Sequence, residues 1–141
     1  MNQLHPAVAK SIAAWHKMIA EKNLAGLPEL VDSDAVFRSP MVYKPYESAQ
    51  AVVLILNAAM GIFENFTYHR ELVSDDGLNV VLEFSANVGD KQLKGIDLVQ
   101  FNADGKIVEF EVMIRPMSGL QALGQETGVR LAHLMPAFQK T

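Results

Sequence analysis

The second half of the chain alternates between apolar and polar residues with the two-residue period of a β-strand. Residues 79–88 alternate most cleanly. Their apolar face carries Val80, Leu82, Phe84, Ala86 and Val88. Turn signals rich in glycine and aspartate separate this segment from its neighbours. The pattern predicts strands over 66–73, 79–88, 93–102 and 107–115.

Apolar residues in the first half recur at helical spacing. The predicted elements there are helices over 6–20, 23–31 and 49–63 and a short strand over 35–38. Asn23 is a suitable N-cap for the second helix and Ser48 for the third. A further helical region is expected from about Ser118, with breaks near Gly128 and Pro136.

Helices that come first, followed by a meander of strands, predict an α+β fold. The helices are expected to pack on one face of a strongly curved antiparallel sheet. A chain of 141 residues is most simply one domain. We expect a single domain over residues 1–141, with a C-terminal helical extension from about residue 117.

The segment GIDLVQF, residues 95–101, places a carboxylate in line with a valine and a phenylalanine. Pairing the strands about Gly89-Asp90 sets Asp97 opposite Leu82, on the apolar face of the sheet. Asp97 is then one of two things. It is a structural carboxylate satisfied by hydrogen bonds, or a pocket carboxyl whose charged form is disfavoured by burial. The residues alone leave both interpretations open.

Composition and charge exclude several functions. The formal net charge is −4 and the Lys and Arg residues are scattered, so no nucleic-acid surface is expected. The absence of cysteine excludes disulfides and thiol chemistry, and the four histidines show no metal-site spacing. We therefore expect no metal and no cofactor. The apolar run 51–63 is too short to span a bilayer and the N-terminus has no signal pattern, which indicates a cytoplasmic protein without a membrane partner.

The order of elements, and the run GIDLVQFNADGKIVEF at residues 95–110, resemble the nuclear-transport-factor-2-like superfamily. This superfamily includes SnoaL-like and ketosteroid-isomerase-like proteins. The resemblance extends from residue 5 to about 116. It implies a cone-shaped α+β barrel whose helices and bent sheet enclose a deep pocket. Because the superfamily contains isomerases, cyclases, dehydratases and non-enzymatic binding proteins, the resemblance implies the fold more strongly than any activity.

The resemblance can be followed to the catalytic positions of the ketosteroid isomerases. Asp97 matches their oxyanion-hole acid, a carboxylic acid that an apolar site keeps neutral. Their general base, an aspartate before a proline, corresponds to Ser39, and their helix tyrosine corresponds to Trp15. The inward His and Asp of the cyclase-like members correspond to Phe110 and Val112. These changes argue against steroid isomerisation and against a His–Asp cyclase mechanism, and they leave Asp97 as the predicted catalytic residue.

The inward faces of these elements predict an apolar pocket with few polar groups, which is typical of small-molecule sites. The expected polar partner of Asp97 is Trp15, followed by Ser39 or His16. The predicted ligand-binding residues are Trp15, His16, Phe37, Ser39, Tyr43, Met60, Phe63, Tyr68, Leu82, Phe84, Val99, Phe110, Val112 and Ile114.

Several functions are compatible with this pocket. In the first interpretation, the protein is an isomerase, cyclase or dehydratase that acts on an apolar cyclic or carbonyl compound, with Asp97 as acid or base. Alternatively, it is a non-catalytic binding module for an apolar ligand, or a dimeric domain with a residual pocket. The resemblance implies a homodimer formed through the outer sheet face. The C-terminal segment is too apolar for a free tail, so we expect it to cover the pocket mouth or a partner subunit.

Overall fold

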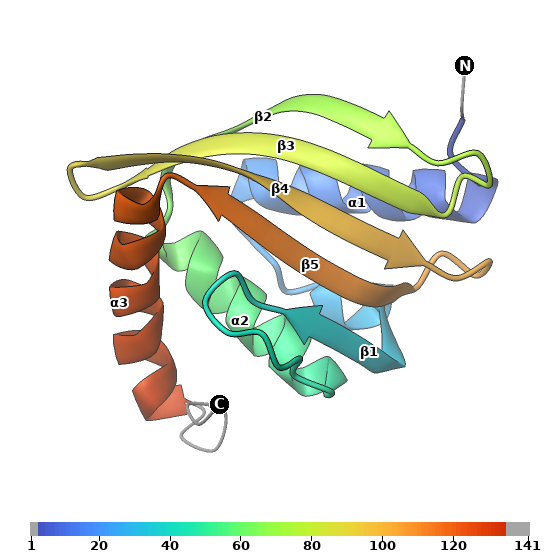
Figure 1. Ribbon diagram of the computed structural model, residues 1–141. Coiled ribbons are helices and arrows are strands. Elements are labelled where there is room, and N and C mark those ends of the chain that lie inside the picture. The colour runs from blue at the N-terminus through green and yellow to red at the C-terminus, as the bar shows by residue number, and fades with distance from the viewer. Residues whose placement is uncertain (1–2, 135–141) are drawn as a thin grey trace.

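In the computed structural model, which describes residues 3–134, three α-helices pack against a curved five-stranded sheet (Figure 1). The helices are α1 (Pro6–Glu21), α2 (Ala49–Ile62) and α3 (Met117–Leu134), with a short 3-10 helix η1 (Leu27–Leu30). The strands are β1 (Val31–Arg38), β2 (Glu64–Val73), β3 (Asn79–Val88), β4 (Lys91–Phe101) and β5 (Ile107–Arg115). This architecture confirms the predicted α+β cone. None of these helices is long and apolar enough to cross a bilayer.

The sheet has the strand order β1-β5-β4-β3-β2. Strands β2 to β5 form the predicted antiparallel meander, and β1 joins the edge parallel to β5, so the sheet is mixed. A parallel pair needs a long connection, which α2 and the meander supply here. The register confirms that Leu82 lies opposite Asp97, and Val112 faces Asp97 from the other side. The carboxylate therefore belongs to the apolar face of a central strand.

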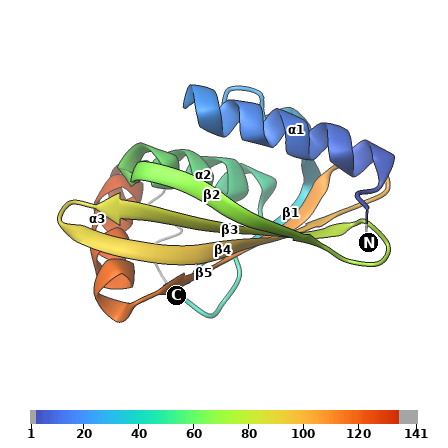
Figure 2. The same cartoon turned by 90° about the horizontal axis from the view of Figure 1, so that it is seen from above.

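Helices α1 and α2 lie on the same side of the sheet, and α3 stands at one end (Figure 2). Ile12 and Trp15 of α1 and Leu56 of α2 join the inward residues of the strands in one buried cluster. Burying one such side chain stabilises the fold by about 1.5–3 kcal/mol. The predicted cap at Ser48 is confirmed, because its hydroxyl oxygen accepts a hydrogen bond from the backbone N–H of Ala51 at 3.1 Å. The helices thus form the second wall of the interior.

The predicted helix over 23–31 is wrong. The Asn23 side chain accepts a hydrogen bond from the N–H of Ala25, and only the single turn η1 follows. Strand β1 already begins at Val31, four residues before the predicted strand. Its aspartates disfavour a strand locally, but pairing of Val31 with Ile107 on β5 overrides that preference.

The predicted break near Gly128 is also wrong, because α3 runs through it to Leu134. Glycine costs a helix about 1 kcal/mol relative to alanine. Leu123 and Leu131 are buried on either side of Gly128, and this packing keeps the helix intact. The break predicted near Pro136 lies outside the described residues. The homodimer through the outer sheet face stays a prediction. Met113 lies on that face and is 44% exposed.

Candidate functional site

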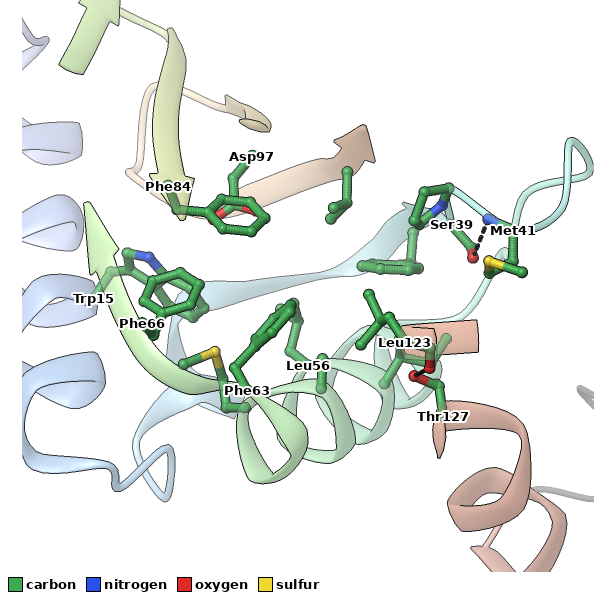
Figure 3. A pocket seen from close by; sticks show the side chains of 16 residues that line it. Trp15, Ser39, Met41, Leu56, Phe63, Phe66, Phe84, Asp97, Leu123 and Thr127 are labelled. Carbon is green, nitrogen blue, oxygen red and sulfur yellow. Dashed lines mark hydrogen bonds between the residues drawn. The ribbon is translucent and has the colours of Figure 1, made fainter. Parts of the chain in front are cut away.

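A narrow apolar cavity lies between the inner face of the sheet and the helices (Figure 3). It leaves about 60 Å³ to the centres of water-sized spheres, enough for roughly four to six water molecules. Its lining comprises Trp15, Phe37, Ser39, Pro40, Met41, Ile55, Leu56, Ala59, Met60, Phe63, Phe66, Phe84, Asp97, Val112, Leu123 and Thr127. Asp97 is the one ionisable side chain in this set.

Three elements hold the Asp97 carboxyl in place. Its strand β4 presents it to the cavity, and the hydroxyl of Tyr68 on β2 donates to Oδ2 at 2.7 Å. The indole N–H of Trp15 on α1 donates in turn to the Tyr68 oxygen at 2.9 Å. Asp97 is 6% exposed. These contacts form a chain of hydrogen bonds that ends at one oxygen of the carboxyl.

The other oxygen of Asp97, Oδ1, opens to the cavity. Within residues 3–134 no side chain or backbone N–H donates a hydrogen bond to it. In the same part of the chain, no fully buried side-chain oxygen lacks a hydrogen-bond partner. Oδ1 therefore keeps contact with open space, and the open space beside Asp97 is the cavity. A bound ligand can reach this oxygen without displacing a protein group.

Burial sets the protonation of Asp97 and Tyr68. Burial in the apolar interior raises the pKa of Asp97 from 3.8 to about 7, against the opposing effect of the hydrogen bond from Tyr68. Burial also raises the pKa of Tyr68 well above its usual value, and the nearby Asp97 carboxylate adds to this. Tyr68 thus remains a proton donor near neutral pH. Asp97 is present there in both its neutral and its ionised form.

The structure corrects the predicted partner of Asp97. Trp15 does not contact the carboxyl directly and reaches it only through Tyr68. His16 points away from the cavity and pairs with Glu71, with 3.0 Å between Nε2 and Oε1. Ser39 lies at the other end of the cavity, where its oxygen accepts from the N–H of Met41 at 3.0 Å (Figure 3).

Eight of the residues predicted for the site line the cavity: Trp15, Phe37, Ser39, Met60, Phe63, Phe84, Asp97 and Val112. The others lie elsewhere. Leu82, Val99 and Phe110 are buried in the main core cluster but do not line the cavity. Ile114 packs on a second apolar cluster. Tyr43 is 98% exposed because its loop projects into solvent, so it does not edge the cavity.

Eight lining residues were not predicted: Pro40, Met41, Ile55, Leu56, Ala59, Phe66, Leu123 and Thr127. Leu56 and Ala59 carry a usable signal, since both belong to the apolar side of α2. Phe66 was hidden because the pairing of β2 with β3 shifts register between Glu64 and Thr67, which disturbs its alternation. Nothing local marks Leu123 and Thr127 as cavity residues, because the position of α3 is decided by tertiary packing.

Aromatic rings surround the carboxyl end of the cavity (Figure 3). Phe66 and Phe84 stack with ring centroids 4.9 Å apart, and Phe63 lies 5.3 Å from Phe66 and 5.7 Å from Phe84. Aromatic faces of this kind favour a flat apolar ligand. Among the described residues, no group of three side chains is suited to hold a metal ion.

Comparison with known proteins agrees with this fold. The chain is 56% identical to a steroid delta-isomerase from Pseudomonas aeruginosa, with a TM-score of 0.92 over 96% of this chain and 99% of that one. It is 29% identical to an uncharacterised bacterial protein with a cystatin-like fold from Silicibacter pomeroyi (TM-score 0.81, 91% and 86% covered). A nuclear-transport-factor-2-like protein of unknown function from Mesorhizobium loti shares the fold at 20% identity (TM-score 0.69, 81% and 99% covered).

The search of curated proteins found no match. The sequence model of the SnoaL-like domain matches residues 12–110, which is most of the described chain. The resemblance seen in the strand that carries Asp97 is thereby confirmed at the level of the family. The chain belongs to the SnoaL-like domain family, and it has the fold of nuclear-transport-factor-2-like proteins.

Proposed function

We propose that the cavity binds a small apolar carbonyl compound and that Asp97 catalyses its isomerisation by moving a proton. The observation that carries the proposal is the position of Oδ1, a titratable oxygen that opens to an apolar cavity and has no partner among the described residues. A pKa of about 7 suits a group that must both take up and release a proton near neutral pH. The similarity to a steroid delta-isomerase supports an isomerase.

The reaction is a shift of a carbon–carbon double bond toward a carbonyl group. Ionised Asp97 removes a proton from the carbon between the carbonyl and the double bond, and the electron pair of that C–H bond forms a dienolate. The same carboxyl then returns the proton to the far carbon of the former double bond. The conjugated ketone is formed and the carboxylate is regenerated. The apolar lining keeps water away from the dienolate.

The size of the cavity favours a compound with a single ring. About 60 Å³ for the centres of water-sized spheres holds roughly four to six water molecules, which is close to the number of heavy atoms in one six-membered ring. A steroid with four fused rings would have to displace the residues that lie opposite Asp97, such as Met41 and Leu123 (Figure 3). Ser39 also replaces the aspartate base at the position of the ketosteroid isomerases. We therefore propose a substrate smaller than a steroid.

Isomerisation of cyclohex-3-en-1-one to cyclohex-2-en-1-one tests the proposal, because the conjugated product absorbs in the ultraviolet. Asp97→Asn keeps an oxygen that accepts from Tyr68 but cannot transfer a proton, and we expect a rate loss of about 100-fold or more. The matched control is Asp34→Asn at an exposed site on β1, which should keep the full rate. A wild-type rate in Asp97→Asn, or no turnover of the ketone by the wild type, contradicts the proposal. Faster turnover of a steroid 5-en-3-one than of the one-ring ketone contradicts the size argument.

A second candidate function is a binding module without catalysis. It is favoured because Asp97 is the one ionisable residue in the lining, so no second acid or base lies beside it there. Trp15 is the single tryptophan of the chain and lines the cavity, so its fluorescence reports on binding. Cyclohex-2-en-1-one and cyclohexene form a matched pair of probes, with and without the carbonyl oxygen. Tight binding of the ketone with no isomerisation of cyclohex-3-en-1-one supports the binding module. Isomerisation that depends on Asp97 excludes it.

A further inference from the structure

We propose that Trp15 and Tyr68 are positioning residues that decide which oxygen of Asp97 carries its proton. The indole N–H orients the tyrosine hydroxyl toward Oδ2, and neutral Asp97 therefore presents its proton on Oδ1, into the cavity. The inference rests on the proposed function of the same site. It concerns the neutral form of Asp97, which prefers a ligand with a neutral acceptor such as a ketone oxygen, whereas the ionised form removes the proton in the proposed reaction.

Trp15 sets the direction of the hydrogen bonds that lead to Asp97. An indole N–H can only donate, because its nitrogen has no lone pair available to accept a hydrogen bond. It lies 2.9 Å from the Tyr68 oxygen, which therefore accepts. The proton of the Tyr68 hydroxyl must then point to another acceptor. Asp97 Oδ2 lies 2.7 Å away, and the described residues offer the hydroxyl no second acceptor.

The direction of these hydrogen bonds decides which oxygen of Asp97 carries the proton. If Oδ2 carried it, the Tyr68 oxygen would accept two hydrogen bonds and its own proton would be left without an acceptor in the protein interior. Such an unsatisfied buried donor is unfavourable. With the proton on Oδ1, the Trp15 N–H and the Tyr68 hydroxyl both have acceptors. The one hydrogen left over points to the cavity, where a ligand oxygen can accept it.

The charged groups around Tyr68 do not reverse the direction in which its hydroxyl donates. Among the described residues, the ionisable side chains beside Tyr68 are Asp97 itself, Glu71 on β2 and His16 on α1. The His16 ring meets the Tyr68 ring edge-on at 5.3 Å and bonds to Glu71 with its Nε2. Neither side chain takes the hydroxyl proton. Burial keeps the pKa of Tyr68 well above its usual value, so the donor persists across neutral pH.

The experiment follows the titration of Asp97 by carbon-13 NMR on protein labelled at the aspartate side-chain carboxyl. The signal is assigned by its loss in Asp97→Asn. Growth of a tryptophan auxotroph on benzothienylalanine replaces the indole N–H by sulfur at position 15 alone, because the chain has one tryptophan. We expect the pKa of Asp97 to rise, since Tyr68 becomes a weaker donor to the carboxylate. Tyr68→Phe removes the donor itself, and we expect a larger rise.

The decisive observation is the combination of the two changes. Trp15 acts only through Tyr68, so the sulfur analogue should cause no further change in a Tyr68→Phe background. The same change in both backgrounds would show that Trp15 acts by packing and would overturn the proposal. An unchanged titration with the sulfur analogue alone would also overturn it, and this result does not require Tyr68→Phe to fold.

Phe110→Leu is the matched control for packing. The Phe110 ring lies 5.6 Å from Trp15 and takes no part in the hydrogen-bond chain, so its truncation should leave the Asp97 titration unchanged. A change as large as that of the sulfur analogue would contradict the proposal. The titration needs no substrate. It can therefore succeed when the isomerase assay fails, and the two proposals are distinguished.

Discussion

The protonation of Asp97 predicts an unusual pH dependence of stability. Burial raises the pKa of this carboxyl from 3.8 to about 7, so the folded state keeps a proton that the unfolded chain releases. The stabilising effect of neutral Asp97 is complete below about pH 4 and is lost as the pH rises through about 7. The two pKa values differ by about three pH units, and at 1.36 kcal/mol for each the full effect is about 4 kcal/mol.

Asp97→Asn isolates this effect, because asparagine stays neutral at every pH and can still accept from Tyr68. The other carboxyl groups contribute equally to both proteins and cancel in the difference. We expect the variant to gain on the wild type by up to about 4 kcal/mol between about pH 4 and pH 8. Urea unfolding, followed by circular dichroism and by Trp15 fluorescence, measures the free energy of unfolding of both proteins.

The substitution also changes stability by an amount that does not depend on pH. This amount is the same at pH 4 and at pH 8, so only the change with pH in the difference between the two free energies of unfolding is diagnostic. A difference that stays constant from about pH 4 to pH 8 would mean that Asp97 titrates as an ordinary exposed aspartate. Such a result would exclude a neutral acid in the cavity. A difference that grows mainly below pH 4 would exclude it equally, because it would indicate a lowered pKa.

Three other substitutions test separate contacts. Hydrogen bonds from Arg70 lower the pKa of Glu83 from 4.5 to about 2, so the wild type should lose stability as the pH falls between these values. Glu83→Gln should lack this loss in urea unfolding. The same pH dependence in both proteins would show that the pair is unimportant. Ser11→Ala should cost about 1–3 kcal/mol in denaturant unfolding, since its hydroxyl donates to the buried carbonyl of Gly105 at 2.5 Å. Tyr43→Ala should change stability by less than about 0.5 kcal/mol and leave the binding of cyclohex-2-en-1-one unchanged; weaker binding would return its loop to the site.

The candidate site was predictable where a side chain's direction follows from local periodicity. Alternation along β4 places Asp97 inward because successive side chains of a strand point to opposite faces. The same reasoning succeeds for Phe84 and Val112, which line the cavity as predicted. Local periodicity does not show which inward residues reach the cavity, and Phe110 is buried in the core without lining it although its face is correct.

The partner of Asp97 was not predictable in the same way. Tyr68 lies 29 residues from Asp97 in the chain and Trp15 lies 53 residues from Tyr68. Strand β2 shifts register between Tyr68 and Glu71, which obscures the alternation that would have shown the direction of the tyrosine. Contacts of this kind depend on strand register and on the seating of α1, and neither has a local signature.

The sequence by itself determined the order of the three main helices and the strands and the face on which Asp97 lies, and its resemblance to known proteins indicated the family. The order and the face follow from short-range periodicity and from turn residues, which act within a few positions of the chain. Only the tertiary structure decided that β1 pairs parallel to β5, that α3 closes one end of the cavity and that Tyr68 holds Asp97. Those outcomes depend on packing between distant segments, and packing selects one arrangement among several that satisfy the same local pattern.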